Sequence, residues 1–380
     1  MLSCELVFPE ACDTEEYYNE EEAASGKIKS LRENAYKIQS QLDNIPQKLK
    51  EKILESYDLH SGLKSRIRQA ECVTNAWLKC FELGTHFRFD YKFVFFNAEF
   101  PGAFICCVNH MKQMQSNLKR GNKKNCVTSL QNMENTSKTR KPKTTVKNWA
   151  ASSYVDGSLI DSFSLYTKYP ENWIMNENMN GDMTCIHNIH NIKNEFHDTV
   201  TLYTADGSVD IKNEFHRQEE LNFKLLIGEI LCGLHVLCEK GSAVIKLFGC
   251  LELYTISVVY IFASHFQKCH IVKPATSRSQ NSELYIVGTS FTTKNEEYIQ
   301  LLEDALDHES PKQVCELNES VLESFYYILD YFQTRRNTAL THIINSINEN
   351  KCLHYANKKQ AEELWLSLHC ILPVEFYLTK

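Results

Sequence analysis

Short apolar and β-branched runs alternate with amphipathic segments through the middle of this chain. The runs have the length and composition of strands and lie at residues 92–98, 200–205, 242–248, 269–273 and 284–287. Residues 218–239 carry regularly spaced leucines and predict a helix that Gly241 ends, and residues 251–266 predict a second, buried helix. Alternation of this kind favours an α/β fold, a mostly parallel, doubly wound sheet with helices on both faces. The last two strands, joined by a short loop, indicate an antiparallel pair at one edge.

The segments that flank this sheet are more polar and mostly helical in pattern. Residues 27–65 predict helices interrupted at Pro46, residues 70–83 predict another, and residues 150–185 have no clear period. We therefore expect three parts: an acidic tail and helical extension at 1–65, the sheet domain at 66–290, and a helical C-terminal extension at 291–380.

Charge is distributed unevenly along the chain. The net charge is −7, but residues 1–24 contain eight acidic residues and no lysine or arginine, so the remainder is close to neutral. We expect this acidic stretch to be a solvated tail. Residues 112–147 carry ten basic residues against one acid, Glu134, and are expected to form a flexible insertion. That insertion is either a flap that contacts phosphates or a tolerated surface loop.

Cysteine usage and apolar content indicate an intracellular protein. The fifteen cysteines are scattered, and no C-x-x-C pair occurs, which argues against a disulfide framework. The N-terminus has no basic-then-apolar signal pattern. The longest apolar run, near Ile256 to Ala263, is far shorter than the roughly 20 residues that span a bilayer. No contact with a membrane is expected.

Three charged residues stand at the ends of successive predicted strands. Asp206 follows one strand, Lys246 lies within the next, and Glu283 precedes the last. Ligands and catalysis gather at the carboxyl ends of strands in an open α/β sheet, so these residues suggest proton-handling chemistry. Each also has a structural explanation when taken alone: a lysine at a strand end, an Asp-Gly turn, and a charge on an edge strand.

Five motifs occur in a fixed order and together resemble a known family. They are Asn75–Lys79, Glu99–Phe104, Ala205–Gly207, Lys246–Phe248 and the block from Lys273 to Tyr285. This set resembles the FtsJ-like RNA 2′-O-ribose methyltransferases, which depend on S-adenosylmethionine (SAM). Within that family it is most similar to the Adrift-type cap methyltransferases and to the FtsJ-like proteins of large cytoplasmic DNA viruses. The resemblance covers roughly residues 66 to 290.

The resemblance implies a Rossmann-like SAM-methyltransferase fold, a seven-stranded, mostly parallel sheet with an antiparallel edge strand. It also implies a catalytic tetrad of Lys79, Asp206, Lys246 and Glu283, with Lys246 as the base. The cofactor would be SAM, held by Glu99, Pro101, Gly102, Ala103, Phe104, Asp182 and Asp206. Glu99 alone could equally be the cap of the helix that follows it. Ala103 departs from the family, many of whose members have a second glycine there.

The implied activity is methylation of an RNA ribose 2′-OH, with capped mRNA as the favoured substrate, in the host cytoplasm or, for a viral protein, in the virion. RNA is then the expected partner, with a protein partner at the helical termini. The alternative is an inactive methyltransferase fold that binds RNA or a protein. The aromatic residues Tyr166, Tyr169 and Trp173 could stack on a base, although core packing is the favoured interpretation.

Two further patterns argue against other chemistries. The cluster Cys185-x-His187-x-x-His190 matches no zinc class by its spacing, so we predict no metal site. The chain has no Walker-type phosphate loop and no G-x-G-x-x-G motif, which argues against a nucleotide hydrolase or a nicotinamide enzyme.

Overall fold

The computed structural model describes residues 1–8, 23–42, 45–119, 148–154, 160–175, 180–211, 214–349 and 355–372. Most of the acidic stretch and most of the basic segment therefore lie outside the described residues. No helix in the described parts of the chain is both long and apolar enough to cross a membrane.

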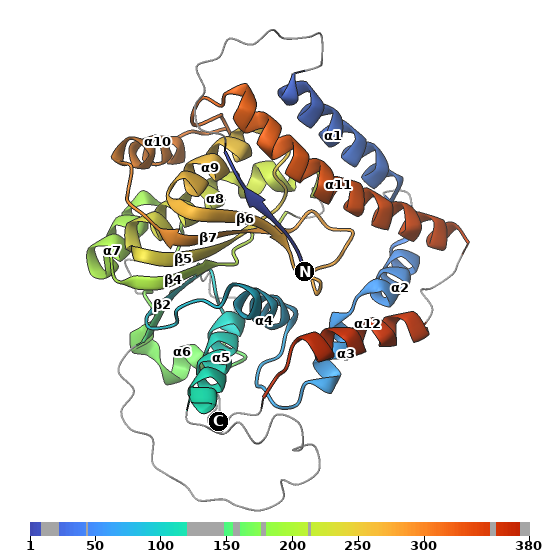
Figure 1. The fold of residues 1–380 in the computed structure, drawn as a ribbon, viewed down its shortest axis with the longest axis horizontal. Coiled ribbons are helices and arrows are strands. Elements are labelled where there is room, and N and C mark those ends of the chain that lie inside the picture. The colour runs from blue at the N-terminus through green and yellow to red at the C-terminus, as the bar shows by residue number, and fades with distance from the viewer. Residues whose placement is uncertain are drawn as a thin grey trace, which may run out of the picture.

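Seven strands form one mixed sheet (Figure 1). They are β1 (Leu2–Leu6), β2 (Val94–Asn97), β3 (Trp149–Ser152), β4 (Val200–Ala205), β5 (Leu237–Leu247), β6 (Phe266–Lys273) and β7 (Leu284–Phe291). Their order across the sheet is β1-β6-β7-β5-β4-β2-β3. The neighbours β3, β2, β4 and β5 are parallel, whereas β7 is antiparallel to both β5 and β6. The predicted α/β class, the seven strands and the late antiparallel pair are confirmed.

One edge of the sheet differs from the expectation. The late pair β6 and β7 does not form the edge, because β1 adds to β6 in antiparallel register, with Leu2 opposite Lys273 and Leu6 opposite Cys269. The N-terminal residues were expected to belong to a solvated tail. They pair with the sheet instead because Leu2, Cys4 and Leu6 alternate with polar residues, and Leu6 reaches the core.

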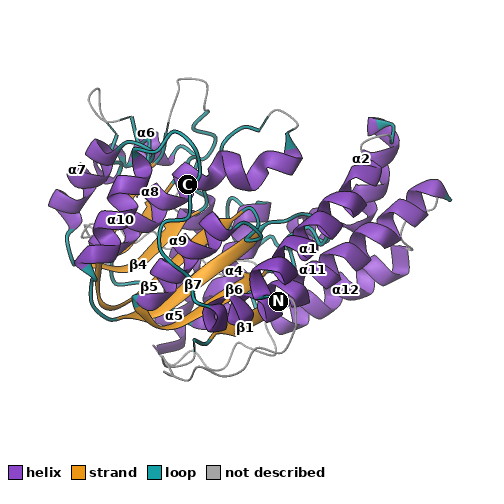
Figure 2. Cartoon of the chain, turned by 90° about the horizontal axis from the view of Figure 1, so that it is seen from above, coloured by secondary structure: helices purple, strands orange, loops and turns teal. Residues whose placement is uncertain are grey.

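Twelve helices among the described residues surround the sheet. They are α1 (Ala24–Gln39), α2 (Gln47–Tyr57), α3 (His60–Arg66), α4 (Asn75–Phe87), α5 (Ala103–Lys119), α6 (Leu165–Lys168), α7 (Ile186–Phe196), α8 (Gln218–Val236), α9 (Leu253–Ser264), α10 (Glu296–Leu306), α11 (Glu319–Asn348) and α12 (Tyr355–Leu368). Figures 1 and 2 show α4 and α5 on one face of the sheet and α8 and α9 on the other.

Side-chain alternation explains how one sheet supports two cores. In β2, Phe95 belongs to the core beneath α7, α8, α9 and α10, and its neighbour Phe96 belongs to the core beneath α4 and α5. Successive strand residues point to opposite faces, so strands buried on both sides are apolar at nearly every position. That is why the strands were visible in the sequence as continuous apolar runs.

The helical extensions come together although they lie at opposite ends of the chain. In Figure 2, α2, α11 and α12 gather to one side of the sheet. The 30-residue α11 joins two cores: its Phe325 belongs to the sheet core, and its Ile343 packs in a smaller cluster that includes Ile53 of α2.

Two local predictions were wrong. The helix predicted to reach residue 239 ends at Val236, and Leu237 already pairs with Val200 of β4. The residues between Leu237 and Ser242 form an irregularity inside β5, so Gly241 is not a helix cap. A run of apolar residues passing from helix to strand has no period that marks the change. The short strand β3 also lies in a region predicted to be irregular.

Candidate active site

Asp206 and Lys246 are neighbours because their strands are parallel and in register. Ala205, the last residue of β4, pairs with Ile245 of β5, so the residues that follow each of them lie side by side. The Nζ of Lys246 is 3.2 Å from Oδ1 of Asp206 and donates a hydrogen bond of 2.6 Å to the backbone carbonyl of Asp206. The carboxyl end of the parallel sheet therefore carries a partly buried ion pair.

Glu283 and Lys79 form a second ion pair at the same end. Glu283 stands just before β7, which runs antiparallel to β5 and pairs Tyr285 with Lys246. Lys79 comes from α4, whose start is fixed by Thr74, since its side chain accepts a hydrogen bond from the N–H of Trp77. The Nζ of Lys79 lies 2.9 and 3.0 Å from the two carboxylate oxygens of Glu283.

Tyr285 connects the two pairs. Its hydroxyl donates a 2.8 Å hydrogen bond to Oδ1 of Asp206, and the Nζ of Lys79 lies 5.7 Å from the centre of its ring. Tyr285 was quoted in the sequence only as part of a motif, with no role. The structure thus brings together all four residues of the predicted tetrad and adds Tyr285 between them.

The charges of the second pair are stabilised by their surroundings. Burial lowers the pKa of Lys79, but the carboxylates of Asp206 and Glu283 outweigh burial and leave the pKa raised. Burial alone would raise the pKa of Glu283, whereas Lys79, the Ser277 hydroxyl and Lys246 lower it to about 2. Ser277 donates a 2.6 Å hydrogen bond to Glu283. Lys79 is therefore held as a cation and Glu283 as an anion near neutral pH.

The segment from Glu99 to Phe104 forms the tight turn predicted after β2. The N–H of Phe104 donates to the Glu99 carboxylate, so Glu99 caps the start of α5, as its structural interpretation predicted. Gly102 has φ +112°, and a Cβ there would lie 2.3 Å from Leu165. Only glycine adopts this conformation in this space without strain. Pro101 precedes Gly102, and Ala103, which is buried, begins α5.

Glu99 is the acidic residue of this turn, and its pKa is strongly raised. Its side chain is buried, and burial, followed by the nearby charge of Asp206, raises its pKa well above the ordinary value. A buried carboxylate of this kind is stabilised when a cation binds beside it. The turn is therefore suited to a positively charged ligand group.

Asp182 lies beside β3. Gly181, with φ +74°, packs so closely on Ser153 that a Cβ would lie 1.9 Å from its carbonyl oxygen. One oxygen of the half-buried Asp182 carboxylate accepts 2.8 Å hydrogen bonds from the N–H and the hydroxyl of Thr184. Asp182 therefore stands next to the carboxyl end of β3, with a defined orientation.

The loop that carries Ser277 and Glu283 is held by the helical extensions. Glu82 of α4 accepts hydrogen bonds from the N–H groups of Ala275 and Thr276, and also from the indole of Trp365 in α12. Arg278 forms a 3.0 Å ion pair with Asp58, which follows α2. In addition, Arg336 of α11 donates to the carbonyl of Gln280 at 3.1 Å. The extensions are thus part of the support of the site.

Two further charged residues were missed from the sequence. Glu229 of α8 is buried, accepts a 3.2 Å hydrogen bond from the N–H of Gly207, and has a pKa raised to about 8 by burial. Lys273 donates to the carbonyls of Asn281 and Glu283, and burial lowers its pKa to about 7. The signal for Glu229 was available, because a lone carboxylate stands inside the apolar run from Ile227 to Leu231.

The three aromatic residues considered for stacking on a base differ in their burial. Trp173 is buried, packs edge-on against Phe100 in the Glu99–Phe104 turn, and stabilises that turn. Tyr169 packs edge-on against Trp149 of β3, in agreement with the core interpretation. Tyr166 is exposed.

The possible metal ligands Cys185, His187 and His190, for which the sequence predicted no metal site, are placed differently from one another. Cys185 and His187 are exposed at the start of α7. Within the described parts of the chain, His190 lies instead beside His235 and Glu303.

Comparison with known proteins agrees with this geometry. The family described as FtsJ-like methyltransferase matches residues 72–291, more than half of the chain. A protein of African swine fever virus named probable methyltransferase is 32% identical over 301 residues, which cover 73% of this chain and 65% of that protein. The match therefore spans less than two thirds of the viral relative.

Two relatives carry more specific names. A Drosophila melanogaster protein named cap-specific mRNA (nucleoside-2′-O-)-methyltransferase 2 is 27% identical over 285 residues, or 70% of this chain and 38% of that protein. The cap-specific mRNA (nucleoside-2′-O-)-methyltransferase of Autographa californica nuclear polyhedrosis virus is 41% identical over 86 residues, or 23% of this chain and 33% of that protein. With its mixed sheet and its family match, the chain belongs to the FtsJ-like methyltransferase family.

Proposed function

We propose that this protein transfers a methyl group from SAM to the 2′-OH of an RNA ribose, on capped mRNA. The single observation that carries the proposal is the convergence of Lys79, Asp206, Lys246 and Glu283 at the carboxyl end of the sheet. The names of the cap-specific relatives favour the capped substrate over other RNAs.

The residues around the turn fit SAM as the cofactor. SAM carries an ammonium and a sulfonium, and the buried carboxylate of Glu99 lies where a cation would compensate its charge. Among the described residues, Oδ1 of Asn97 and Oγ of Ser152 are buried without a hydrogen-bond partner. Their residues are the last of β2 and β3 and stand opposite each other in the register of the sheet. In this proposal Glu99, Pro101, Gly102, Ala103, Phe104, Asp182 and Asp206 hold SAM.

The four residues of the tetrad then have different roles in the reaction. When bound, SAM supplies an electrophilic methyl group. A ribose hydroxyl is a weak nucleophile, so removal of its proton by a positioned base helps the reaction. In our proposal Lys246 first gives the proton of its ammonium to solvent; the Nζ of the neutral amine then takes the proton of the ribose hydroxyl, and Asp206 orients the amine through the contacts described above. Lys79, held as a cation by Glu283, stabilises negative charge that develops on the ribose oxygen.

The substrate's phosphates need a basic surface. The segment 112–147, with ten basic residues, lies between β2 and β3 in the chain and follows the Glu99–Phe104 turn through α5. We propose that it contacts the RNA backbone. Removing residues 120–147, beyond the end of α5, should weaken RNA binding and flatten its dependence on salt. An unchanged salt slope would make the segment a passive loop.

The decisive experiment measures transfer of labelled methyl from SAM to capped RNA. Lys246→Ala should reduce the rate by about 10²–10⁴, the usual range for loss of a general base. Lys224→Ala, which removes an exposed lysine of α8, is the matched control and should keep full activity. Full activity of Lys246→Ala would contradict the mechanism.

Calorimetry with SAM separates this proposal from the inactive alternative. A well-folded protein that does not bind SAM, yet binds RNA, would support a methyltransferase fold used only for binding. Methyl transfer to uncapped RNA at the same rate as to capped RNA would leave the reaction but overturn the choice of substrate.

A further inference from the structure

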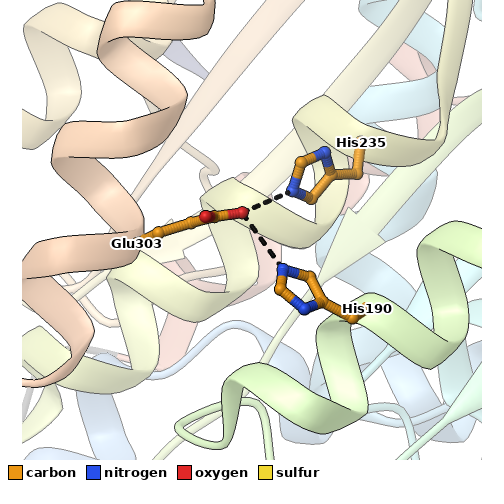
Figure 3. Close-up of side chains that lie close together, drawn as sticks. All are labelled: His190, His235 and Glu303. Atoms are coloured by element: carbon orange, nitrogen blue, oxygen red, sulfur yellow. Dashed lines mark hydrogen bonds and ion pairs between the residues drawn. The ribbon is translucent and has the colours of Figure 1, made fainter.

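Three helices bring two imidazoles and a carboxylate together outside the candidate active site (Figure 3). His190 lies in α7, His235 is the next-to-last residue of α8, and Glu303 lies in α10. One ligand atom from each lies within 4.8 Å of the others. Nothing in the tetrad's chemistry uses these residues.

The cluster stands at the opposite end of the parallel strands from the tetrad. His235 directly precedes the pairing of Leu237 with Val200, whereas Asp206 and Lys246 follow the pairing of Ala205 with Ile245. Five residues of β4 separate those two levels, roughly 17 Å at about 3.3 Å per residue. The cluster is therefore a separate site.

Apolar contacts fix the three helices that carry the cluster. Ile189 precedes His190, Leu234 precedes His235, and Leu302 precedes Glu303, and all three apolar side chains are fully buried in the same core. The polar side chains that follow them lie at the rim of that core. The packing of α7, α8 and α10 therefore determines where these three groups stand.

Both imidazoles face one carboxylate oxygen. The Nε2 of His190 is 3.1 Å from Oε1 of Glu303, and the Nε2 of His235 is 3.5 Å from the same atom. Figure 3 shows the two rings directed toward Glu303 from either side. A tetrahedral zinc ion with bonds of about 2.0–2.1 Å holds its ligand atoms about 3.3 Å apart. The two measured separations lie on either side of that value.

His235 lacks the contacts that a buried polar side chain ordinarily has. It is 1% exposed, and among the described residues neither of its ring nitrogens forms a well-aligned hydrogen bond; Nε2 has only the 3.5 Å contact with Glu303. Buried polar groups are nearly always satisfied, and an exception requires an explanation, such as an ion.

We propose that His190, His235 and Glu303 form a binding site for a divalent transition metal ion of the zinc class, with water at the remaining position. Imidazole nitrogen and carboxylate oxygen are ligands that zinc accepts. Because its ligands come from α7, α8 and α10, the ion joins three helices at the amino end of the strands.

Positive charges near the site set a limit on its affinity. Lys193 and Lys294 both act on His235 through their charge. Lys294 lies 3.2 Å from the carbonyl of His235, but its amine is paired with Asp198 at 2.7 Å. The carboxylate of Glu303 supplies the negative charge that favours a cation.

The competing interpretation is a simple hydrogen-bonded group in which Glu303 accepts from His190. It accounts for the 3.1 Å contact but leaves Nε2 of the buried His235 with only a 3.5 Å contact to the same carboxylate oxygen. The two interpretations differ in a measurable property, the uptake of one metal ion by these ligands.

The test uses the full chain, stripped of metal with a chelator and titrated with Co²⁺ or Zn²⁺ alone. We expect one Co²⁺ per chain, with the intense visible absorption of a low-coordinate site, and a melting temperature that rises with metal concentration. His190→Ala and Glu303→Gln each remove one ligand at a partly exposed position and should weaken binding at least tenfold. His187→Ala, an exposed histidine on the same helix, should bind like the wild type.

The outcomes decide the proposal in either direction. Absence of binding to well-folded protein would overturn it, and so would equal binding by the wild type, His190→Ala and Glu303→Gln. Loss of binding in His187→Ala would locate the ion elsewhere on α7 and overturn it as well. His235→Ala is less informative, because removing a buried ring also creates a cavity.

Discussion

The two ends of the parallel strands hold charged groups in opposite ways. At the carboxyl end, Lys79, Glu283, Asp206 and Lys246 form two ion pairs joined by Tyr285. At the amino end, His235 is more deeply buried, and within the described structure its ring has only the 3.5 Å contact of Nε2 with Glu303 and no well-aligned hydrogen bond. The same strands and the same α8 support both ends. A satisfied network is suited to holding charge states for a reaction, and an unsatisfied one is suited to taking up a ligand.

The largest expected effect is that a variant at one end of the strands loses methyl transfer or Co²⁺ binding and keeps the other. Asp206→Asn should reduce methyl transfer by about 10² or more and leave Co²⁺ binding unchanged, because the amino end lies elsewhere in the fold. Glu303→Gln should weaken Co²⁺ binding and leave methyl transfer largely intact. Both variants are measured in both assays. A single variant that abolished both activities would show that the two ends are not independent.

Glu283→Gln should change how the free energy of unfolding depends on pH, because it removes one of the paired charges at the carboxyl end of the strands. The pKa of Glu283 is lowered from an ordinary 4.5 to about 2, so its charge stabilises the folded protein above pH 4.5. That stability is lost as the pH falls through about 2. A shift of this size corresponds to a few kcal/mol.

Urea denaturation of the wild type and Glu283→Gln should therefore differ most at neutral pH and converge in acid. Glu195→Gln, an exposed position on α7, is the control. Parallel pH curves for the wild type and Glu283→Gln would show that the ion pair with Lys79 does not lower this pKa.

Trp365→Phe tests whether the extensions support only the carboxyl end. The change removes one hydrogen bond to the buried carboxylate of Glu82, which holds Ala275 and Thr276. Loss of a hydrogen bond to a charged group costs about 1.5–3 kcal/mol. We expect that loss of unfolding free energy and slower methyl transfer, with unchanged Co²⁺ affinity. Stability equal to the wild type would exclude α12 as a support of the loop.

Ala103→Gly should have the smallest effect on stability, and it tests whether the methyl group of Ala103 in the Glu99–Phe104 turn affects SAM binding. Removing one methyl group at the first residue of α5 should cost less than about 1 kcal/mol of stability. If that methyl crowds the cofactor, calorimetry will show tighter SAM binding in the variant. Gly102→Ala is the contrasting change and should fold poorly, because φ is +112° there and Leu165 fills the space. Tighter SAM binding by Gly102→Ala would contradict this description.

The sequence was informative where a side chain's neighbours in the chain determine its place. Apolar runs predicted the strands that are buried on both faces, and the motif order predicted which four charged residues would meet. The strands follow from local pattern, whereas the set of four follows from the resemblance to the family; the rule that parallel strands share their carboxyl ends suggested only Asp206, Lys246 and Glu283.

Other features depend on contacts between distant segments and left no local signal. The pairing of Leu2–Leu6 with β6 joins residues more than 260 positions apart. His190 and Glu303 are 113 positions apart, and His235 is placed by the end of α8, which was predicted three residues too far along the chain. The hydrogen bond from Tyr285 to Asp206 also follows from register rather than from motif.

The contacts that the helical extensions make with the Ala275–Gln280 loop determine how far this protein can be shortened. A fragment limited to the family-matched residues 72–291 would lack Asp58, Arg336 and Trp365, and with them every tether described above from the helical extensions to that loop. It would also lack β1, so the edge of β6 would be exposed. An exposed strand edge can pair with another chain and promotes self-association. Failure of such a fragment to methylate RNA would therefore say nothing about the chemistry of the tetrad.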